Sequence, residues 1–489
     1  MPEQNDLELL LRSQIPIVVI ESLEEPRILQ LFTRLGLRMG QAVFQWTVTE
    51  GLRRQEVDFG SSDQNRDPGD VLRHIKSEAQ PGLYLLLDFH PYARDPLHVR
   101  LIKEIAQGYA LIPRTLVFIG CCFDTPLEVR HLSARFELKL PDRAGIKRLI
   151  MEEAKAWQAR SRKAVSADPK AVEQLATNLT GVSASDARRL VRAAIEDDGA
   201  IRHDDLPKVM KAKYDLINQD GLISYEYDTA HFSDLAGLEH LKTWLETRRK
   251  LFHLNSGALD RPKGIMLLGV QGGGKSLAAK AVAGIFGVPL LRLDFGNLYN
   301  KYIGETEKNL RVALATAETM APCVLWMDEI EKGIAPGQSD DGVSQRILGT
   351  LLTWMAENRA GVFVVATSND IQRLPPELVR KGRLDEIFFV DLPSRESRRE
   401  IFNIHLRRRN QAPSRFDLDL LAQASEGFTG AEIEQVIVSS LYNAHSREQA
   451  LTTESLLEEL ERTSPLSVVM AEKISWLRQW AADRTVPAG

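Results

Sequence analysis

Residues Gly269 to Ser276 read GVQGGGKS, which fits the pattern G-x-x-x-x-G-K-[ST]. An apolar run at 264–268 precedes this glycine-rich segment, and an alanine-rich run at 277–283 follows it. This order predicts a strand, a loop and a helix, which is the context that gives the pattern its meaning. Glycines let backbone N–H groups curl around a phosphate chain, and the helix N-terminus adds partial positive charge. The segment therefore predicts a phosphate-binding loop in an α/β fold.

Each residue of this glycine loop has an expected role. Lys275 would reach the β- and γ-phosphates of ATP, and the Ser276 hydroxyl would hold Mg²⁺. The remaining loop residues that we expect to contact the nucleotide are Gly269, Gln271, Gly272, Gly273, Gly274 and Leu277. A glycine-rich turn that only caps a helix is the alternative, and the motifs that follow argue against it.

An apolar run at 323–327 ends in two adjacent carboxylates, Asp328 and Glu329. Asp328 would ligate Mg²⁺ through water, and Glu329 would polarise the attacking water as general base. An apolar strand that ends in Asp-Glu also arises by chance. We interpret the pair as the catalytic carboxylates because it follows the glycine loop, as a P-loop ATPase requires.

A third apolar run, at 362–367, leads to Asn369. Asn369 would hold the attacking water or the γ-phosphate, although an asparagine after a strand is often only a turn residue. Arg380 and Arg383 follow, too far along the chain to serve their own nucleotide. We interpret them as arginine fingers for the ATP of a neighbouring subunit, and solvated surface charge is the alternative.

In this order the motifs resemble the AAA+ ATPases, in the branch whose best-known members thread or disassemble proteins. The resemblance runs from residue 230 to about residue 480. Residues 232–238 resemble the segment of that branch that passes the adenine, which implies a nucleotide contact at Gly237. His405 matches a histidine near the ribose and adenine, and a purely structural helix histidine stays the alternative.

Residues 427–432 resemble the lid motif of the same branch. Gly430 and Ala431 stand there in place of the sensor arginine of other AAA+ clades, so we expect both beside the nucleotide and assign no lid arginine. The sequence departs from the branch at Glu331-Lys332, where relatives have Asp-Ser or Asp-Ala. We expect this departure to have little effect on hydrolysis.

The residues Tyr302, Ile303 and Gly304 lie between the glycine loop and the two carboxylates. In threading relatives such a loop faces a central pore and grips polypeptide, so the resemblance implies a pore loop here. An aromatic and an aliphatic side chain intercalate between client side chains without requiring a sequence, and the glycine lets the loop bend.

The first half of the chain repeats landmarks of the second half in the same order. The offset between matching landmarks stays between 240 residues, from Asp88 to Asp328, and 252 residues, from Pro141 to Pro393. The matching pairs are 83–88 with 324–328, 115–119 with 362–366, 136–141 with 388–393, and 181–187 with 427–433. We therefore expect an AAA-like fold in both halves.

The chemistry of the second half is missing from the first half. The segment 20–26 stands where a glycine loop is expected, but it has no glycine and no Lys-Ser. Phe89 replaces the catalytic glutamate, and Cys122 replaces the sensor asparagine. Asp88 and His90 have no third metal ligand nearby in the sequence, so we interpret them as structural remnants at a strand end.

The full layout resembles an AAA family known from cyanobacteria and from a chloroplast open reading frame. The residues that carry this resemblance are Asp88-Phe89-His90-Pro91, Pro465-Leu466-Ser467 and Ile474 to Ala481. The expected fold is α/β: a degenerate AAA-like domain with its own small helical lid, a linker, a P-loop AAA+ domain with a parallel sheet, and a helical lid with a C-terminal helix. The expected boundaries are 1–215, 216–231, 232–393 and 394–489.

Bulk properties restrict the class of partner. The net charge is −5, which does not suit a surface that coats nucleic acid. No apolar run approaches the roughly 20 residues of a membrane helix. The three cysteines show no ligand spacing, so we expect a reducing, cytoplasmic compartment.

Three function classes stay open. The first is an ATP-hydrolysing remodeller of protein clients that acts as a homo-oligomeric ring, a hexamer, because arginine fingers need a neighbour. The second is an ATP-dependent regulatory switch or assembly factor that binds partners without threading them. A nucleic-acid remodeller is the third and weakest reading, since the expected pore loop is aromatic and not basic.

Overall fold

The computed structural model describes residues 2–55, 65–218, 221–226, 235–253, 260–298, 305–334, 341–378, 380 and 382–489. The chain divides into two compact units. The first unit comprises Met1–Asp142 with Ser183–Ala187, and the second comprises Arg143–Val182 with Arg188–Gly489. The described residues include no helix both long enough and apolar enough to cross a membrane.

A seven-stranded sheet forms the centre of the second unit, in the order β15-β14-β10-β13-β12-β11-β9. The strands are β9 (Ile223–Glu226), β10 (Gly264–Gly269), β11 (Leu290–Leu293), β12 (Cys323–Met327), β13 (Val362–Ser368), β14 (Glu386–Val390) and β15 (Val486–Pro487). All neighbouring strands pair in parallel except β9, which runs antiparallel to β11. Parallel pairing brings the carboxyl ends of β10, β12 and β13 to one edge, where open α/β sheets bind ligands.

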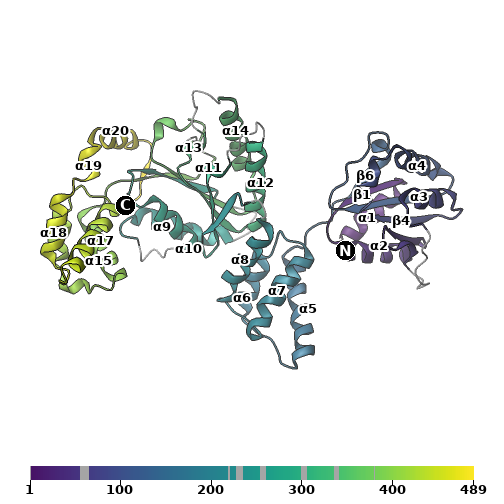
Figure 1. Cartoon of the computed structure of the whole chain (residues 1–489), viewed down its shortest axis with the longest axis horizontal. Helices are drawn as coiled ribbons and strands as arrows, with labels where there is room; N and C mark the ends of the chain where they lie inside the picture. The colour runs from purple at the N-terminus through teal and green to yellow at the C-terminus, as the bar shows by residue number, and fades with distance from the viewer. Residues whose placement is uncertain are drawn as a thin grey trace. The chain divides into compact units, whose positions relative to one another are not determined.

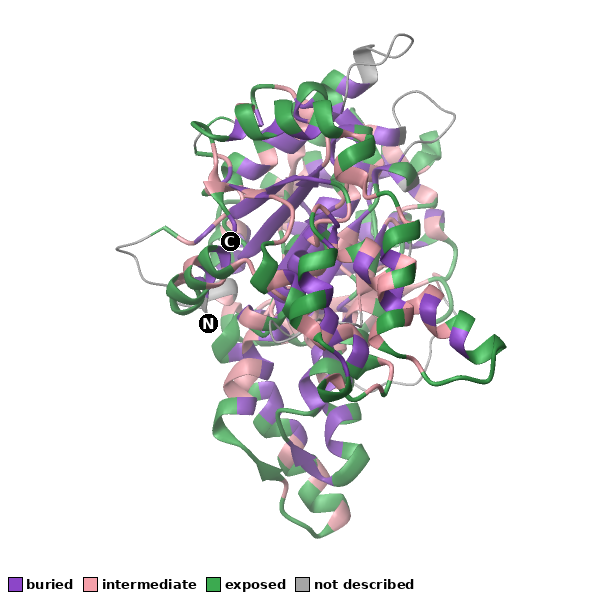
Figure 2. Cartoon of the chain, turned by 90° about the vertical axis from the view of Figure 1, so that its left-hand side faces the viewer, coloured by how far each residue is buried: buried purple, intermediate pink, exposed green. Residues whose placement is uncertain are grey.

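Helices cover both faces of this sheet (Figure 1). On one face lie α9 (Glu239–His253) and α10 (Lys275–Phe286); on the other lie α11 (Phe295–Leu298), α12 (Glu305–Met320), α13 (Glu331–Ile334) and α14 (Asp341–Glu357). Under α9 and α10, the rings of Phe252 and Phe286 stack with centroids 4.8 Å apart, and Phe363 meets Phe286 edge-on. The buried strands and the exposed outer faces of the helices are visible in Figure 2. Burial on both faces explains why these strands are continuous apolar runs in the sequence.

A helical lid follows β14. It contains α15 (Arg395–Arg408), α16 (Leu418–Ala424), α17 (Gly430–Ser446) and α18 (Thr453–Arg462), followed by α19 (Leu466–Val469) and α20 (Ala471–Ala481). Buried Phe402, Leu421 and Ile433 are part of the lid core. Thr429 starts α17 with a capping box, because its hydroxyl accepts the Glu432 N–H while the Glu432 carboxylate accepts the Thr429 N–H. Beyond α20 the chain returns to the sheet as β15.

The first unit has a six-stranded sheet in the order β3-β2-β4-β5-β1-β6. Its elements are β1 (Ile17–Glu21), β2 (Ala42–Thr47), β3 (Gly51–Arg54), β4 (Gly82–Leu87), β5 (Arg114–Gly120) and β6 (Ser133–Arg135), with α1 (Pro2–Arg12), α2 (Glu25–Met39), α3 (Pro68–Ser77) and α4 (Pro96–Gln107). The run β6-β1-β5-β4-β2 has the same order as β14-β10-β13-β12-β11, and each sheet adds an antiparallel edge strand. The predicted fold class is confirmed in both halves.

Short elements complete the chain. They are β7 (Ser166–Ala167), β8 (Ala200–Ile201) and the 3₁₀ turns η1 (Tyr92–Arg94), η2 (Gly108–Ala110), η3 (Arg130–Leu132), η5 (Ile371–Arg373) and η6 (Pro413–Arg415). Along the chain, four helices follow the first sheet and precede the second. They are α5 (Arg143–Ser161), α6 (Pro169–Asn178), α7 (Ala184–Asp198) and α8 (Asp205–Ile217). The first compact unit comprises Met1–Asp142 with Ser183–Ala187, whereas the first domain expected from the sequence runs to residue 215. The difference lies in helices α5 to α8, most of whose residues belong to the second compact unit. Within that unit α8 contacts α12.

The loop between β1 and α2 stands where a glycine loop would be, and it contains a buried carboxylate. Glu24 is 6% exposed. It accepts hydrogen bonds from the N–H groups of Ala184 and Ser185, and it pairs with Arg27 at 2.6 Å. A carboxylate of this loop therefore already binds the backbone N–H groups at the start of α7.

Helix α8 has a fully buried lysine. Lys213 donates hydrogen bonds to the carbonyl oxygens of Asn178, at 2.7 Å, and Thr180, at 2.8 Å. Burial lowers the pKa of Lys213 to about 7. Desolvation disfavours the ammonium, and neither of these two acceptors is a carboxylate.

We expect Lys213→Met to remove a pH-dependent part of the stability. An unfolded lysine keeps its proton up to about pH 10.4, whereas folded Lys213 loses it near 7. Between these values the unfolded chain binds more protons, so the stability of the parent chain rises with pH. Urea denaturation at about pH 7 and about pH 9 should show the parent gaining stability relative to Lys213→Met. Lys211→Met, at an exposed position of α8, is the matched control. A pH-independent difference for Lys213→Met would contradict the account.

Candidate nucleotide site

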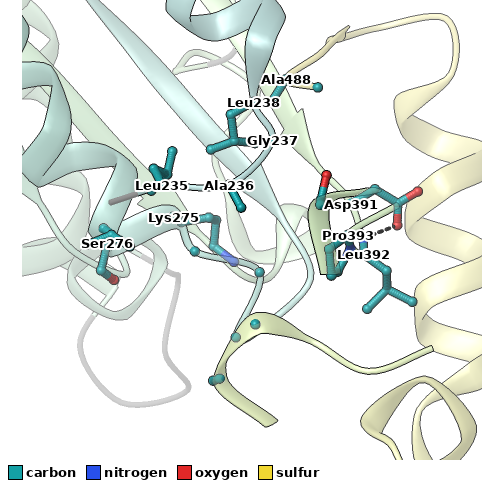
Figure 3. A pocket seen from close by; sticks show the side chains of 18 of the residues that line it. Leu235, Ala236, Gly237, Leu238, Lys275, Ser276, Asp391, Leu392, Pro393 and Ala488 are labelled. Carbon is teal, nitrogen blue, oxygen red and sulfur yellow. Dashed lines mark hydrogen bonds between the residues drawn. The ribbon is translucent and has the colours of Figure 1, made fainter. Parts of the chain in front are cut away.

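A cavity of about 950 Å³ lies at the carboxyl edge of the second unit's sheet, between the sheet and the lid. Figure 3 shows Leu235 to Leu238, Lys275, Ser276 and Asp391 to Pro393 around this cavity, with Ala488 beside Leu238. The predicted nucleotide and catalytic residues that line it are Gly237, Gln271, Gly272, Gly273, Gly274, Lys275, Ser276, Leu277, Asp328, Glu329, Asn369, His405, Gly430 and Ala431. Gly269 is the last residue of β10, directly before this group. The fold thus gathers residues that are widely separated in the sequence.

The glycine loop has the geometry that its sequence predicts. Gly274 takes a left-handed conformation, with φ of 96°, directly before α10 begins at Lys275. A side chain would be strained at that backbone angle, so glycine suits the turn. The Lys275 ammonium is buried and donates to the carbonyl oxygens of Gly269, at 3.0 Å, and Val270, at 2.8 Å. Burial lowers the pKa of Lys275 to about 8, against the opposing influence of nearby carboxylates that include Glu331 and Asp328.

One hydroxyl of β13 contacts both Asp328 and Glu329 at the end of β12. The Thr367 hydroxyl donates to Asp328 Oδ1 at 2.7 Å and accepts the N–H of Glu329 at 3.0 Å. Arg292 of β11 pairs with Asp328 Oδ2 at 3.1 Å. Asn369 donates its amide to Glu329 Oε1 at 3.0 Å. The sequence analysis identified the carboxylates and Asn369 but missed the contributions of Thr367 and Arg292.

Glu329 has a left-handed backbone, with φ of 47°. This conformation is uncommon for a residue with a side chain, and such strain gathers at functional sites. It turns the chain sharply after β12, and Glu329 and Asp328 both line the cavity.

The Glu331-Lys332 departure from the family pattern contacts Asn369 and Glu329. Glu331 is buried, and its carboxylate accepts the N–H of Asn369 at 2.9 Å. Lys332 is exposed and pairs with the second carboxylate oxygen of Glu329, and this hydrogen bond raises the pKa of Lys332. Exposed ion pairs contribute little, so a small effect on hydrolysis stays our prediction for Lys332.

Residues of the lid line one side of the cavity. The His405 side chain is 13% exposed and lies 3.4 Å from the Glu434 carboxylate. Burial lowers the pKa of His405, while Glu434 opposes this shift. The N–H of Ala431 donates to the Gly272 carbonyl at 3.4 Å, so the lid contacts the glycine loop directly.

The end of the chain also lines this cavity, which the sequence analysis missed. β15 pairs with β14, and the Ala488 N–H donates to the Phe389 carbonyl at 3.0 Å. The Ala488 carbonyl accepts the Leu241 N–H at 3.1 Å. Arg478 of α20 pairs with Asp391 at 2.9 Å. A strand of two residues is too short to show an alternating pattern in the sequence. It forms because it pairs with a neighbouring strand.

The two predicted finger arginines do not line the cavity. Arg380 is exposed, and Arg383 donates to the carbonyl of Glu377. Neither arginine lines the cavity of its own chain. The predicted pore loop, Tyr302 to Gly304, lies outside the described residues, as does the first part of the adenine segment, 232–234.

Comparison with known proteins agrees with this geometry. The family model "ATPase family associated with various cellular activities (AAA)" matches residues 265–392, and an AAA+ lid domain matches 415–459. Models for the N-terminal and second domains of SpoVK-like AAA ATPases match 3–138 and 144–220. The uncharacterized AAA domain-containing protein ycf46 of Pyropia yezoensis is 35% identical, and the match covers 98% of this chain and 97% of that protein.

The chain belongs to the ycf46 family of AAA ATPases. The ycf46 protein of Guillardia theta is 34% identical over 98% of this chain and 94% of its own length. A more distant relative, the proteasome-activating nucleotidase of Aeropyrum pernix, is 37% identical over 42% of this chain and 51% of that protein. The resemblance seen in the sequence is confirmed, and the chain is an ATPase that binds ATP.

We expect Thr367→Val to lower ATP turnover about 10- to 100-fold, as is typical when a residue that positions a metal ligand is lost. Valine keeps the shape of threonine but removes the hydroxyl that bridges Asp328 and Glu329. Steady-state ATPase assays over a Mg²⁺ titration measure the loss. Thr316→Val is the matched control, because Thr316 is also buried but bonds only within α12. Equal turnover in the two variants would contradict the bridging role.

Proposed function

We propose that this chain is a ring-forming ATPase, a hexamer, that uses ATP turnover to remodel protein clients. One observation carries the proposal: Arg380 and Arg383 do not line the cavity of their own chain. An ATPase of this class needs positive charge on the transferred phosphate, which a finger from a neighbouring subunit supplies. A ring places that neighbour at every site.

The proposed roles within the site follow from its donors. Lys275 binds the β- and γ-phosphates, and Glu329 orients and polarises the attacking water together with Asn369. Ser276 and Asp328 offer oxygen donors on the same cavity, which is the ligand type that Mg²⁺ prefers. When bound, Mg²⁺ would neutralise charge on the phosphates. Gly237, His405, Gly430 and Ala431 would line the adenosine.

Chains with different defects should restore one another's activity. Lys275→Ala removes nucleotide binding, and Arg383→Ala removes the finger, so each homo-oligomer should be inactive. A mixture forms some interfaces with an intact glycine loop and an intact finger. We expect ATPase assays of the mixture to exceed the sum of the separate proteins. Activity that is independent of protein concentration, in a species that light scattering shows to be monomeric, would contradict the proposal.

The second function class, a regulatory switch, has its own support. In the first unit the loop that stands in the glycine-loop position has no glycine, and its Glu24 carboxylate accepts the N–H groups of Ala184 and Ser185 at the start of α7. A domain without a glycine loop suits partner binding, so nucleotide turnover in the second unit would control assembly instead of threading. The name of the Aeropyrum pernix relative, proteasome-activating nucleotidase, supports the protein-remodelling class. We propose a protein client and not nucleic acid, since the net charge is −5; a cytoplasmic location stays a prediction.

Tyr302→Ala should separate the two functions. If the chain threads polypeptide, the variant should keep basal ATPase activity but lose its stimulation by an unfolded model protein and fail to unfold that protein. Tyr442→Ala removes an exposed tyrosine of α17 and serves as the control that keeps both activities. Complementation of a deletion strain by Tyr302→Ala would contradict threading and favour the switch.

A further inference from the structure

In the first unit, two strand ends bring together side chains that are far apart in the sequence. β4 and β5 pair in parallel, and Leu87 lies opposite Ile119 at their carboxyl ends. The chain continues from β4 to His90 and from β5 to Cys121 and Cys122. This edge corresponds to the edge of the second unit's sheet at which Asp328 and Asn369 follow β12 and β13. The third ligand that the sequence around Asp88 and His90 lacks is therefore supplied by the neighbouring strand.

The ligand atoms of His90, Cys121 and Cys122 all lie within 4.8 Å of one another. The two sulfur atoms are 3.7 Å apart. Two thiolates bound to one tetrahedral zinc ion, each at about 2.3 Å, have their sulfurs about 3.8 Å apart. The spacing of the thiols thus already matches one edge of a zinc coordination tetrahedron.

His90 provides an independent observation. Its Nδ1 atom is buried from solvent and has no hydrogen-bond partner among the described residues. Most buried polar side-chain atoms in proteins are paired, so an orphaned imidazole nitrogen requires an explanation. A metal ion at the thiols would provide the missing partner, since neutral imidazole nitrogen is a common zinc ligand.

The surroundings hold His90 at this point. Phe89, beside it, is 1% exposed and packs edge-on against Trp46, with ring centroids 5.4 Å apart. Gly120 leaves room at the end of β5: a Cβ there would lie 3.3 Å from His90 Nδ1 and 3.4 Å from Asp88 Oδ1. The imidazole and one carboxylate oxygen therefore flank the same space directly before the two cysteines.

We propose that Cys121, Cys122 and His90 form a zinc site at the sheet edge of the first unit, with Asp88 or water as the fourth ligand. Thiolate and imidazole ligands favour Zn²⁺ over Mg²⁺, which prefers oxygen donors. Both cysteines are exposed, so the ion exchanges with solution without unfolding of the domain. This inference concerns residues outside the nucleotide site and does not depend on the proposed function.

The test uses the full-length chain, purified under reducing conditions, stripped with a chelator and loaded with Zn²⁺ or Co²⁺. Elemental analysis after dialysis should give one zinc ion per chain. Co²⁺ should give the near-ultraviolet thiolate-to-cobalt charge-transfer band, which oxygen ligands at the nucleotide site do not produce. Cys323, the third cysteine, is fully buried within β12, so the band reports the exposed pair.

Cys121→Ser, Cys122→Ser and His90→Ala should each weaken Zn²⁺ binding at least about 10-fold, the lower bound seen when even an outer partner of a metal ligand is lost. His131→Ala, an exposed histidine of the same unit, is the matched control and should bind as the parent does. Far-ultraviolet circular dichroism and the thermal unfolding of the first unit should match the parent in all four variants, which verifies that each is folded.

A parent chain that shows no charge-transfer band and retains no zinc would overturn the proposal. So would a band that survives in both serine variants. If either serine variant does not fold, the comparison of His90→Ala with His131→Ala decides, because unchanged zinc affinity in His90→Ala excludes the imidazole as a ligand.

Discussion

The parallel pairing of β12 with β13 is the constraint on which the site depends. Met327 lies opposite Ala366, so the next residues, Asp328 at the end of β12 and Thr367 within β13, lie side by side. One hydroxyl then holds both the carboxylate expected at the metal and the backbone of the expected base. Because β10 pairs with β13 on its other side, the same edge receives the glycine loop and Lys275. A shift in register would separate all of these groups.

The first unit has the same strand order with different chemistry at its edge. Glu24 takes the backbone donors beside the loop that follows β1, and a phenylalanine fills the position after Asp88. The edge is not empty of polar groups, since His90 and two cysteines converge there. The two sheets thus share a strand order but differ in the side chains that gather at the corresponding edge.

The parts of the site that were predicted from the sequence have local signals. The glycine loop is recognised from its own glycines, and Asp328 and Glu329 directly follow their strand. The sequence pattern and the position in the chain are therefore sufficient to predict these parts of the site. Thr367 and Arg292 were not predicted, because their roles depend on which strands are neighbours. The same holds for β15, which exists only by pairing with β14, and for His90 with Cys121, which no sequence spacing connects. The fold class could be predicted from the landmarks that repeat along the sequence. Contacts between neighbouring strands could not be predicted, because they depend on the register in which the strands pair.

The central claim is that only the second of two similar sheets binds ATP. Calorimetric titration of full-length Glu329→Gln with ATP and Mg²⁺ tests it most directly, since slow turnover in this variant keeps the nucleotide intact. We predict one ATP bound per chain, and none when Lys275→Ala is added to the same chain. Two nucleotides per chain, or binding that persists without Lys275, would contradict the account.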